Sequence, residues 1–215
     1  LLDMGNGSVG ALQEYADLLR PDAVFLSHLH ADHCVDLVAY SYARQAHPGG
    51  LGPVAVHGPY GTRERLTAIG GGGRTAFDGI FDFVTTRRGK SAIGPFDVTL
   101  EPAAHPVETY SIRLEAADRT VVYSGDSGPT PALVRNAKGA DLLLSEATWD
   151  DVGVHPPDLH MTAREAGQHA HRAEAGRLWL VHTTPFTDPA ALREQAAASF
   201  QGELDIAAPG AAYTL

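Results

Sequence analysis

Short apolar runs, each bounded by turn residues, recur along the chain and predict β-strands. Their lengths match those of strands in ordinary globular proteins. The expected strands cover residues 23–27, 54–57, 81–85, 96–102, 110–114, 120–124, 141–145, 178–182 and 204–207.

Apolar positions at helical spacing lie between several of these runs. They predict helices over residues 9–19, 32–46, 62–69 and 131–138. Two further helices have a recognisable start. Thr162 and Glu165 form a capping box that opens a helix reaching His171. Asp188 before Pro189 opens a helix that runs to about Phe200.

The order of these elements indicates the fold class. Strands pair like hairpins in the middle of the chain and alternate with helices at both ends, which favours an α/β fold of two sheets between helix layers, αββα. With 215 residues and 44% hydrophobic content, the chain can bury a sizeable core without disulfides. We therefore expect a single domain over residues 1–215, with residues 70–73 as a flexible surface loop.

Composition and charge narrow the function classes. The formal net charge of −10 gives no general attraction for a polyanion such as nucleic acid. Cys34 is the only cysteine, which excludes a disulfide framework and a cysteine-rich zinc site. No apolar run reaches the roughly 18 residues of a membrane span, and no signal peptide is visible. We expect a cytoplasmic protein without membrane contact, and we expect that its natural N-terminus precedes Leu1.

Four residues of metal-binding type gather where the first expected strand ends. His28 and His30 are two positions apart and project to the same side, and Asp32 and His33 follow in the turn. Imidazole nitrogens and carboxylate oxygens are ligands that zinc accepts, and a mixed set leaves room for water. Burying four such groups without a cation carries a heavy desolvation penalty. The pattern therefore predicts a metal site.

Other strand ends carry the candidates for the remaining ligands. His105, Asp126, Glu146 and His182 each stand where an apolar strand stops. Such ends are where α/β folds place their sites. Asp126 has a second interpretation as a helix cap ahead of Pro131. Together with the first cluster, these residues predict one polar site built from several strands.

This order of residues resembles the metallo-β-lactamase superfamily. The matching residues are His28-x-His30-x-Asp32-His33, then His105, Asp126 and His182. Residues 144–148 and 160–166 resemble two signature strings of its ribonuclease Z branch. Residues 155–167 and 2–13 resemble the atypical class II cyclic-nucleotide phosphodiesterases of that branch. The resemblance spans almost the whole chain and implies a four-layer αββα sandwich, without the strand pair that opens other members.

The resemblance also implies a dinuclear metal centre. It assigns one ion to His28, His30 and His105, the second to Asp32, His33 and His182, and a bridging role to Asp126. Two divalent ions about 3.5–4 Å apart share a hydroxide that attacks phosphorus in line. We expect Zn²⁺, with Mn²⁺ and Fe²⁺ as alternatives that suit the same ligands.

Three residues are expected to act in catalysis, namely Asp32, His160 and Glu146. His160 is assigned to transition-state stabilisation or to protonation of the leaving oxygen, with an exposed loop residue as the alternative. Glu146 is expected to hold the His160 imidazole in one tautomer. The other histidines are expected to be structural or on the surface: His47, His57, His155, His169 and His171.

Two departures from ribonuclease Z decide between substrates. Ser145 stands where that branch has histidine, and the long basic arm that grips tRNA has no counterpart. We therefore expect a phosphodiesterase for a small cyclic nucleotide such as cyclic AMP, with a tRNA 3′-processing endonuclease ranked below it. A metal-binding protein without catalysis, or a hydrolase of lactams, thioesters or sulfate esters, stays open because fold does not fix function. The resemblance further implies a homodimer.

Overall fold

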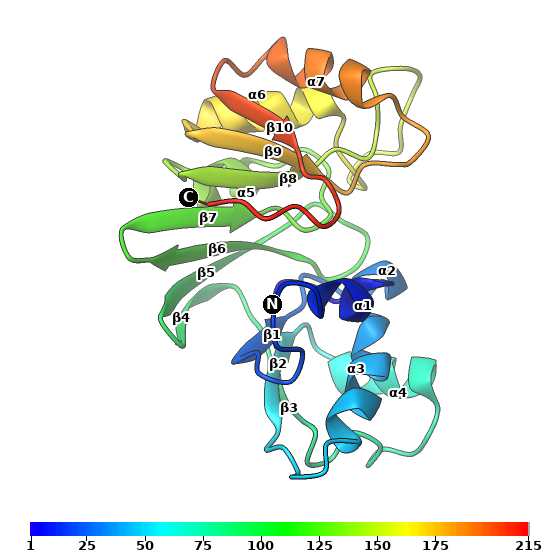
Figure 1. The fold of residues 1–215 in the computed structure, drawn as a ribbon. Helices are drawn as coiled ribbons and strands as arrows, with labels where there is room; N and C mark the ends of the chain where they lie inside the picture. Colours follow the sequence, from blue (N-terminus) through cyan, green and yellow to red (C-terminus); the bar gives the residue numbers. More distant parts are fainter. Residues whose placement is uncertain (215) are drawn as a thin grey trace. The chain divides into compact units, whose positions relative to one another are not determined.

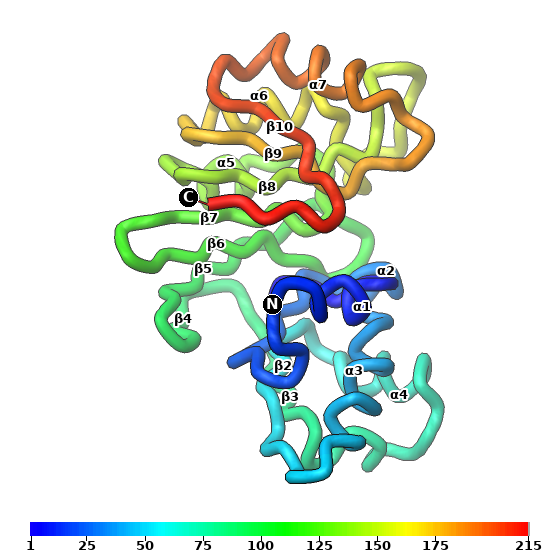
Figure 2. Tube along the Cα trace, viewed as in Figure 1, coloured from blue at the N-terminus to red at the C-terminus, as the bar shows by residue number. Residues whose placement is uncertain are grey.

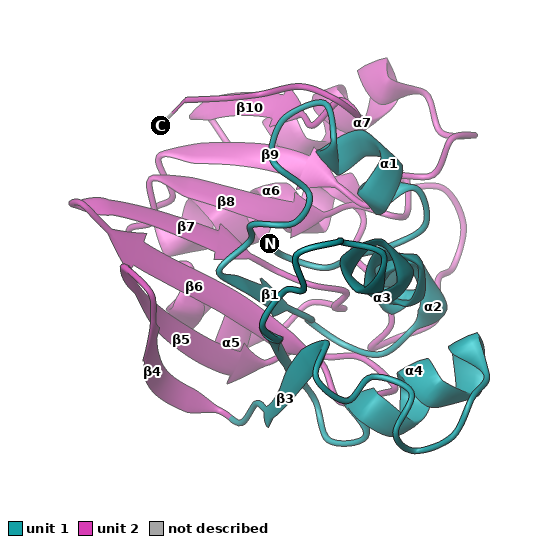
Figure 3. Ribbon diagram, turned by 60° about the horizontal axis from the view of Figure 1, so that its bottom comes forward, with its two compact units in different colours: residues 1–87 teal, residues 88–215 magenta. Residues whose placement is uncertain are grey.

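The computed structural model describes residues 1–214. The chain divides into two compact units, unit 1 over Leu1–Arg87 and unit 2 over Arg88–Leu215 (Figure 3). Each unit has its own sheet and its own buried core. That residues 1–215 act as a single domain stays a prediction.

Unit 1 is built on a small parallel sheet in the order β1 (Ala23–Phe25), β2 (Val54–Gly58) and β3 (Phe81–Thr85). Helices α3 (Asp36–Gln45) and α4 (Thr62–Gly70) pack against each other, and α4 packs against β3. The core joins both layers, with Val24 and Val56 from the strands and Leu37, Tyr40 and Leu66 from the helices. The blue and cyan part of Figure 1 shows this arrangement.

Two expected helices of unit 1 differ from the structure. The helix predicted over residues 9–19 is only α1 (Ser8–Leu12), which has no buried residue that would stabilise a longer helix. The helix predicted over 32–46 is two helices, α2 (Ala31–Cys34) and α3. The backbone of Met4 causes the break, because its N–H donates to His33 O at 2.8 Å and its carbonyl accepts from Asp36 N at 3.0 Å.

Unit 2 contains a seven-stranded sheet in the order β10-β9-β8-β7-β6-β5-β4. Pairs from β4 to β7 are antiparallel and those from β7 to β10 are parallel, as the expected hairpins and β–α units require. The strands are β4 (Gly89–Ile93), β5 (Phe96–Pro102), β6 (Tyr110–Ala116), β7 (Arg119–Tyr123), β8 (Leu142–Glu146), β9 (Arg177–Val181) and β10 (Glu203–Ile206).

Three helices pack against the sheet of unit 2 and supply its core. They are α5 (Pro131–Asn136), α6 (Ala163–Ala173) and α7 (Pro189–Ala197). Alanines on α6, among them Ala166 and Ala170, are fully buried against Leu143 and Leu178 of the strands. The capping box predicted at Thr162 is present, and the Asp188 side chain caps α7. The expected α/β fold, with sheets flanked by helices, is confirmed.

The strand β4 was missed by the hydrophobic pattern. Residues 89–92 of this strand are exposed, because β4 is the edge strand of the sheet and pairs only with β5. An edge strand with no buried face shows no alternation of apolar and polar residues, so the pattern does not predict it. Elsewhere the strand ends move by a residue or two, so that Glu146 is the last residue of β8 and His182 follows β9.

The segment after β10 returns across the sheet of unit 2, as the red end of the tube in Figure 2 shows. There the Tyr213 ring lies 4.0 Å from the Trp179 ring, centroid to centroid, and Arg177 donates to Thr214 O. This contact covers part of β9 on the side opposite Leu178 and Leu180. Within residues 1–214, no helix is long and apolar enough to cross a membrane.

Candidate metal centre

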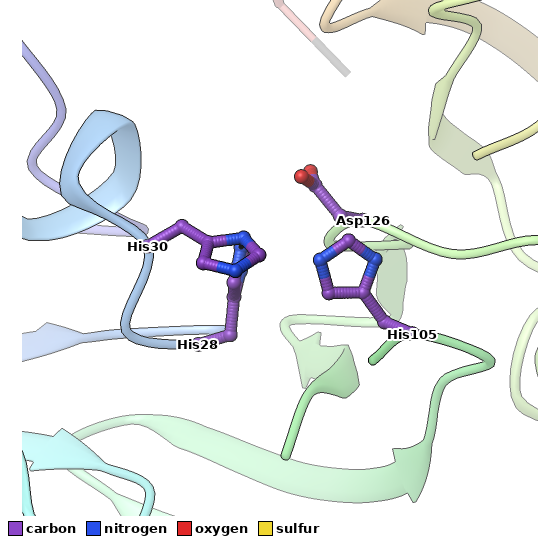
Figure 4. A group of neighbouring side chains, drawn as sticks. All are labelled: His28, His30, His105 and Asp126. Carbon is purple, nitrogen blue, oxygen red and sulfur yellow. Dashed lines mark hydrogen bonds between the residues drawn. The ribbon is translucent and has the colours of Figure 1, made fainter. Parts of the chain in front are cut away.

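The metal-type residues of unit 1 follow directly after β1. His28 is fully buried, and its ring meets that of His30 edge-on with centroids 4.7 Å apart (Figure 4). His28 Nε2 and His30 Nδ1 are 3.0 Å apart. His33 is 3% exposed at the end of α2, whereas the Asp32 side chain is 64% exposed. The short turn between β1 and α2 thus groups these four side chains locally.

Asp3 orients two of these histidines. Its Oδ2 accepts from Nδ1 of His33 at 2.8 Å and from the Ser27 hydroxyl at 2.8 Å. The Ser27 oxygen in turn lies 3.0 Å from His28 Nδ1 and accepts its proton. Both rings therefore carry their hydrogen on Nδ1, which leaves Nε2 as the metal-binding nitrogen. We refer to Asp3, Ser27, His28 and His33 as the Asp3 network.

Asp3 was not among the residues singled out from the sequence. Its position depends on β1, because Asp3 N donates to Phe25 O at 2.8 Å. Asp3 also has a φ of 51°, a left-handed conformation that non-glycine residues seldom adopt. A buried carboxylate in that conformation often marks a functional constraint.

In unit 2, His105 and Asp126 lie in loops that follow β5 and β7 (Figure 4). His105 donates from Nδ1 to the carbonyl of Leu159 at 2.9 Å, which again leaves Nε2 for a metal ion. Asp126 is 2% exposed, and its Oδ1 lies 3.6 Å from His182 Nε2. Thr130, not Asp126, caps α5, so the helix-cap interpretation of Asp126 is wrong.

Glu146 is the centre of a second network in unit 2. It is fully buried, and both oxygens accept hydrogen bonds. Oε1 accepts from Ser127 N and from His160 Nδ1, the latter at 3.0 Å. Oε2 accepts from Met161 N and from the Thr148 hydroxyl at 3.0 Å. The hydrogen bond expected between Glu146 and His160 is therefore present.

The Glu146 network also reaches His182. Thr148 Oγ1 donates to Glu146 and lies 2.8 Å from His182 Nδ1, so it accepts the ring hydrogen of His182. The backbone of His182 has a φ of 52°, and the Thr148 hydroxyl also contacts its carbonyl. The rings of His160 and His182 stack with centroids 5.4 Å apart. We refer to Glu146, Thr148, His160 and His182 as the Glu146 network.

The donor set suits divalent cations. One carboxylate oxygen of Asp126 and one ring nitrogen each of His160 and His182 lie within 4.8 Å of one another. Buried histidines whose Nε2 is oriented by a carboxylate or carbonyl on Nδ1 are a common arrangement around zinc. The residues thus fit a metal ion, although the same grouping makes His160 a candidate ligand as well as a candidate acid.

Sequence comparison places these residues in a family. The profile of the β-lactamase superfamily domain matches residues 2–183, which includes every expected metal ligand. The chain belongs to the metallo-β-lactamase superfamily. This confirms the family expected from the histidine motif, and it makes the protein a metallo-hydrolase by fold.

Three proteins of similar sequence illustrate the range of relatives of this superfamily member. Uncharacterized protein ML1173 of Mycobacterium leprae is 36% identical, over 100% of this chain and 78% of its own. The probable metallo-hydrolase YhfI of Bacillus subtilis is 32% identical over 98% and 85%. Ribonuclease Z of Myxococcus xanthus is 28% identical over 98% and 86%.

Solved structures agree on the fold. The crystal structure of YhfI superimposes with a TM-score of 0.87 at 30% identity, covering 97% of this chain and 84% of YhfI. A diphosphatase of the PhnP family superimposes with a TM-score of 0.71 over 96% and 76%, and at 18% identity this likeness shows the fold alone.

Ser145 differs from the histidine of ribonuclease Z in chemistry as well as in size. Its side chain is fully buried, and its hydroxyl donates to the backbone carbonyl of Glu146 at 3.1 Å. A serine hydroxyl, unlike an imidazole, does not ionise near neutral pH. The position therefore supplies no second imidazole beside His160.

Cys34 and three other histidines have structural surroundings. Burial raises the pKa of the Cys34 thiol to about 11, and its Sγ faces His30 O at 3.2 Å. Burial lowers the pKa of His169, which bridges Glu165 O and Thr130 N, and that of His57, which stacks on Phe25. His155 stacks on Trp149, whose ring also contacts His160 edge-on.

Proposed function

We propose that this superfamily member is a dinuclear metal-dependent phosphodiesterase that hydrolyses small cyclic nucleotides such as cyclic AMP. The ligands proposed are His28, His30 and His105 for one ion, Asp32, His33 and His182 for the other, and Asp126 for both.

The observation that carries the proposal is the Glu146 network. A carboxylate that accepts from Nδ1 of His160 at 3.0 Å fixes the imidazole and stabilises its protonated form. The imidazolium then donates from Nε2 to the oxygen that leaves phosphorus. Phosphodiester hydrolysis needs such an acid, because an alkoxide is a poor leaving group.

Two divalent ions, when bound, supply Lewis acidity and lower the pKa of water so that a nucleophile exists near neutral pH. The chain's own part is to hold the donor atoms in place. The Asp3 network orients His28 and His33, and the Glu146 network orients His182. Asp32, exposed beside His33, is proposed to bind an ion and to orient the attacking water.

A small substrate fits the charge of the chain. Binding of a long nucleic acid draws on many Lys and Arg contacts to phosphates. This chain has 16 Lys and Arg against 26 Asp and Glu, and thus carries little of the general attraction that tRNA binding requires. A single phosphodiester would need few such contacts, because two bound metal ions and His160 would be enough to hold it.

Processing of tRNA 3′ ends is the second candidate. The named ribonuclease Z relative, 28% identical over nearly the whole chain, favours it. Ser145 counts against it, because the hydroxyl is committed to the Glu146 backbone. Zinc as the resident metal, a homodimer and a cytoplasmic location stay predictions that accompany the first candidate.

The test is a comparison of kcat/KM for cyclic AMP and for a tRNA precursor on the same metal-loaded, full-length chain. We expect measurable turnover of cyclic AMP and little or none of the precursor. His160→Ala should slow turnover of cyclic AMP roughly 10²–10⁴-fold while keeping the metal, and His47→Ala, at a partly exposed histidine after α3, is a matched control. Efficient trimming of tRNA with no turnover of cyclic AMP would establish the second candidate instead.

A further inference from the structure

Basic side chains gather over one face of the sheet in unit 2, away from every residue proposed to bind metal. They line a pocket of about 550 Å³ formed by β4, β5, β6 and the end of α5. The cations are Arg88, Lys90, Arg113, Arg135 and Lys138, which include both lysines of the chain.

The strand register explains why these side chains share one face. Lys90 of β4 pairs with Thr99 of β5, and Thr99 pairs with Arg113 of β6, which places the three in one row across the sheet. Side chains two positions apart on a strand point to the same side, so Glu101 and Glu115 lie on the same face in the neighbouring rows. Val98 and Leu100 alternate with them and are buried on the other face.

The charge of this pocket is opposite to that of the protein. Five cations against two carboxylates, Glu101 and Glu115, leave +3 in the lining, and +2 once Glu174, the ion-pair partner of Lys138, is counted, whereas the whole chain carries −10. A local cluster of cations attracts anions even on a protein of negative net charge, and salt weakens that attraction because the cations are exposed. A cluster of this sign is not explained by the general surface composition.

One cation, Arg113, is fixed in the floor of the pocket, and Arg88 is paired with a carboxylate at the rim. Arg113, whose side chain is 18% exposed, donates to Asn136 O and Lys138 O at 3.0 Å each and to Glu115 at 2.9 Å. Arg113 therefore satisfies carbonyls at the end of α5 and holds that end over the sheet. Arg88 donates twice to Oε1 of Glu101, at 3.3 and 3.2 Å.

The rim carries the cations that remain exposed. The side chains of Arg88 and Arg135 are 64% and 62% exposed, and Lys90 is exposed on the edge strand. Arg135 Nη2 stands 3.9 Å from Glu101 Oε2, too far for a hydrogen bond. These groups can turn toward a bound anion while keeping their positions on the sheet and helix.

The floor also offers acceptors. Asn136 is 3% exposed, and its Nδ2 donates to Ser111 Oγ at 2.9 Å, while its Oδ1 makes no hydrogen bond. Glu101 Oε2 likewise makes none. Buried acceptors without donors are unusual in folded proteins and indicate a water or a ligand. A ligand for this pocket therefore carries several negative charges and also N–H or O–H donors.

We propose that this pocket binds a nucleoside polyphosphate, with its phosphates among Arg88, Lys90 and Arg135 and its donor groups toward Asn136 and Glu101. Arginine guanidinium groups match phosphate oxygens with paired hydrogen bonds. A volume of about 550 Å³ lies within the range of small-molecule sites. The site is separate from the proposed metal ligands and does not depend on the proposed function.

The test is calorimetric titration of the full-length, as-purified protein with AMP-PNP, an ATP analogue whose β–γ bond resists hydrolysis. The variant Arg88→Ala/Lys90→Ala removes two exposed rim cations, of which Arg88 also pairs with Glu101. The matched control, Arg119→Ala/Arg177→Ala, removes two exposed arginines that pair with Asp141 and Glu203 elsewhere in unit 2. Thermal unfolding of both variants checks that the fold is retained.

We expect one AMP-PNP per chain at this pocket, with affinity that falls as salt rises. The rim variant should weaken binding roughly tenfold or more, since each lost charge-assisted hydrogen bond carries that order of effect, and the control should not. Equal affinity in rim variant and control, or no AMP-PNP binding, would overturn the proposal. If a 12-nucleotide RNA binds through the same cations while AMP-PNP does not, the occupant is a polynucleotide and the proposal is wrong.

Discussion

The Asp3 network of unit 1 and the Glu146 network of unit 2 each orient two histidine rings, but through different residues. In each, one buried carboxylate contacts one histidine directly and a second one through a hydroxyl, Ser27 or Thr148. In unit 1 both histidines are proposed metal ligands. In unit 2 only His182 is, and His160 is proposed as the acid.

This difference indicates that the two networks have different roles in metal binding and proton transfer. A carboxylate that orients two ligands affects metal binding alone. A carboxylate that orients one ligand and one acid affects metal binding and proton transfer together. Substitutions in the two networks should therefore separate metal content from turnover, and the following predictions test that separation.

The largest effect is expected for Asp126→Ala. Asp126 is buried beside His182 and is proposed to bind both ions, so its loss should strip at least one ion and reduce activity to background. Elemental analysis with a turnover assay measures both. Full occupancy with normal turnover would remove the bridging assignment.

His160→Ala should lower kcat by roughly 10²–10⁴, the usual scale for one acid–base group, and leave the metal content unchanged. His160 Nδ1 contacts Glu146, which orients the ring, and the metal content of the variant decides between acid and ligand. The measurement is kcat together with metal content. If both fall in parallel, His160 is a ligand, as its grouping with Asp126 and His182 also allows.

Asp3→Asn and Glu146→Gln compare the networks directly. Loss of the charge that orients a metal-bound imidazole typically weakens metal affinity roughly 10–100-fold. We expect Asp3→Asn to weaken metal binding and, at saturating metal, to restore most of kcat. Glu146→Gln should lower kcat even at saturating metal, because His160 loses its partner. If added metal restored kcat equally in both variants, the proposed difference between the two networks would be contradicted.

Ser27→Ala and Thr148→Val remove the two hydroxyl relays and should have smaller effects. Each deletes neutral hydrogen bonds, which corresponds to roughly 2–10-fold in affinity. Thr148→Val preserves side-chain shape, and Ser27→Ala removes one atom from a fully buried site. Metal titration monitored by competition with a chelator measures both. An effect larger than that of Asp3→Asn would place the hydroxyl, and not the carboxylate, at the centre of the network.

The smallest effect on activity is expected at Cys34, which lies beside the Asp3 network without joining it. Burial raises its pKa to about 11 from 9.0, so the native thiol should react with iodoacetamide roughly 100-fold more slowly than the unfolded chain at pH 8. Because the folded-state pKa is the higher one, stability from this shift is present below pH 9 and is lost between pH 9 and about 11. Rapid native labelling, or loss of metal in Cys34→Ala, would contradict a structural role.

The sequence revealed the first ligands because they are local. His28, His30, Asp32 and His33 occupy one turn after an apolar strand, and spacing alone predicts that they gather. The carboxyl ends of parallel strands likewise indicated Glu146 and His182. Asp3 was missed because its contact with His33 spans thirty residues and depends on the pairing of Leu2 with Phe25.

Other parts of the fold could not be predicted for equally physical reasons. The edge strand β4 has no buried face, and the interruption between α2 and α3 comes from hydrogen bonds to Met4, far away in sequence. Of the cations in the basic pocket, only Arg88 and Lys90 lie within two residues of each other in the sequence. Its remaining cations come from β6 and α5, which the strand register brings to the same face.

The most direct test of the central claim, that the chain binds two metal ions in one dinuclear centre, is electron paramagnetic resonance of the full-length chain titrated with Mn²⁺. Two ions about 3.5–4 Å apart and sharing ligands should give a spin-coupled spectrum at two equivalents per chain. Asp126→Ala should abolish the coupling. Two uncoupled Mn²⁺ signals at full occupancy, or saturation at one equivalent, would contradict the dinuclear centre and the mechanism built on it.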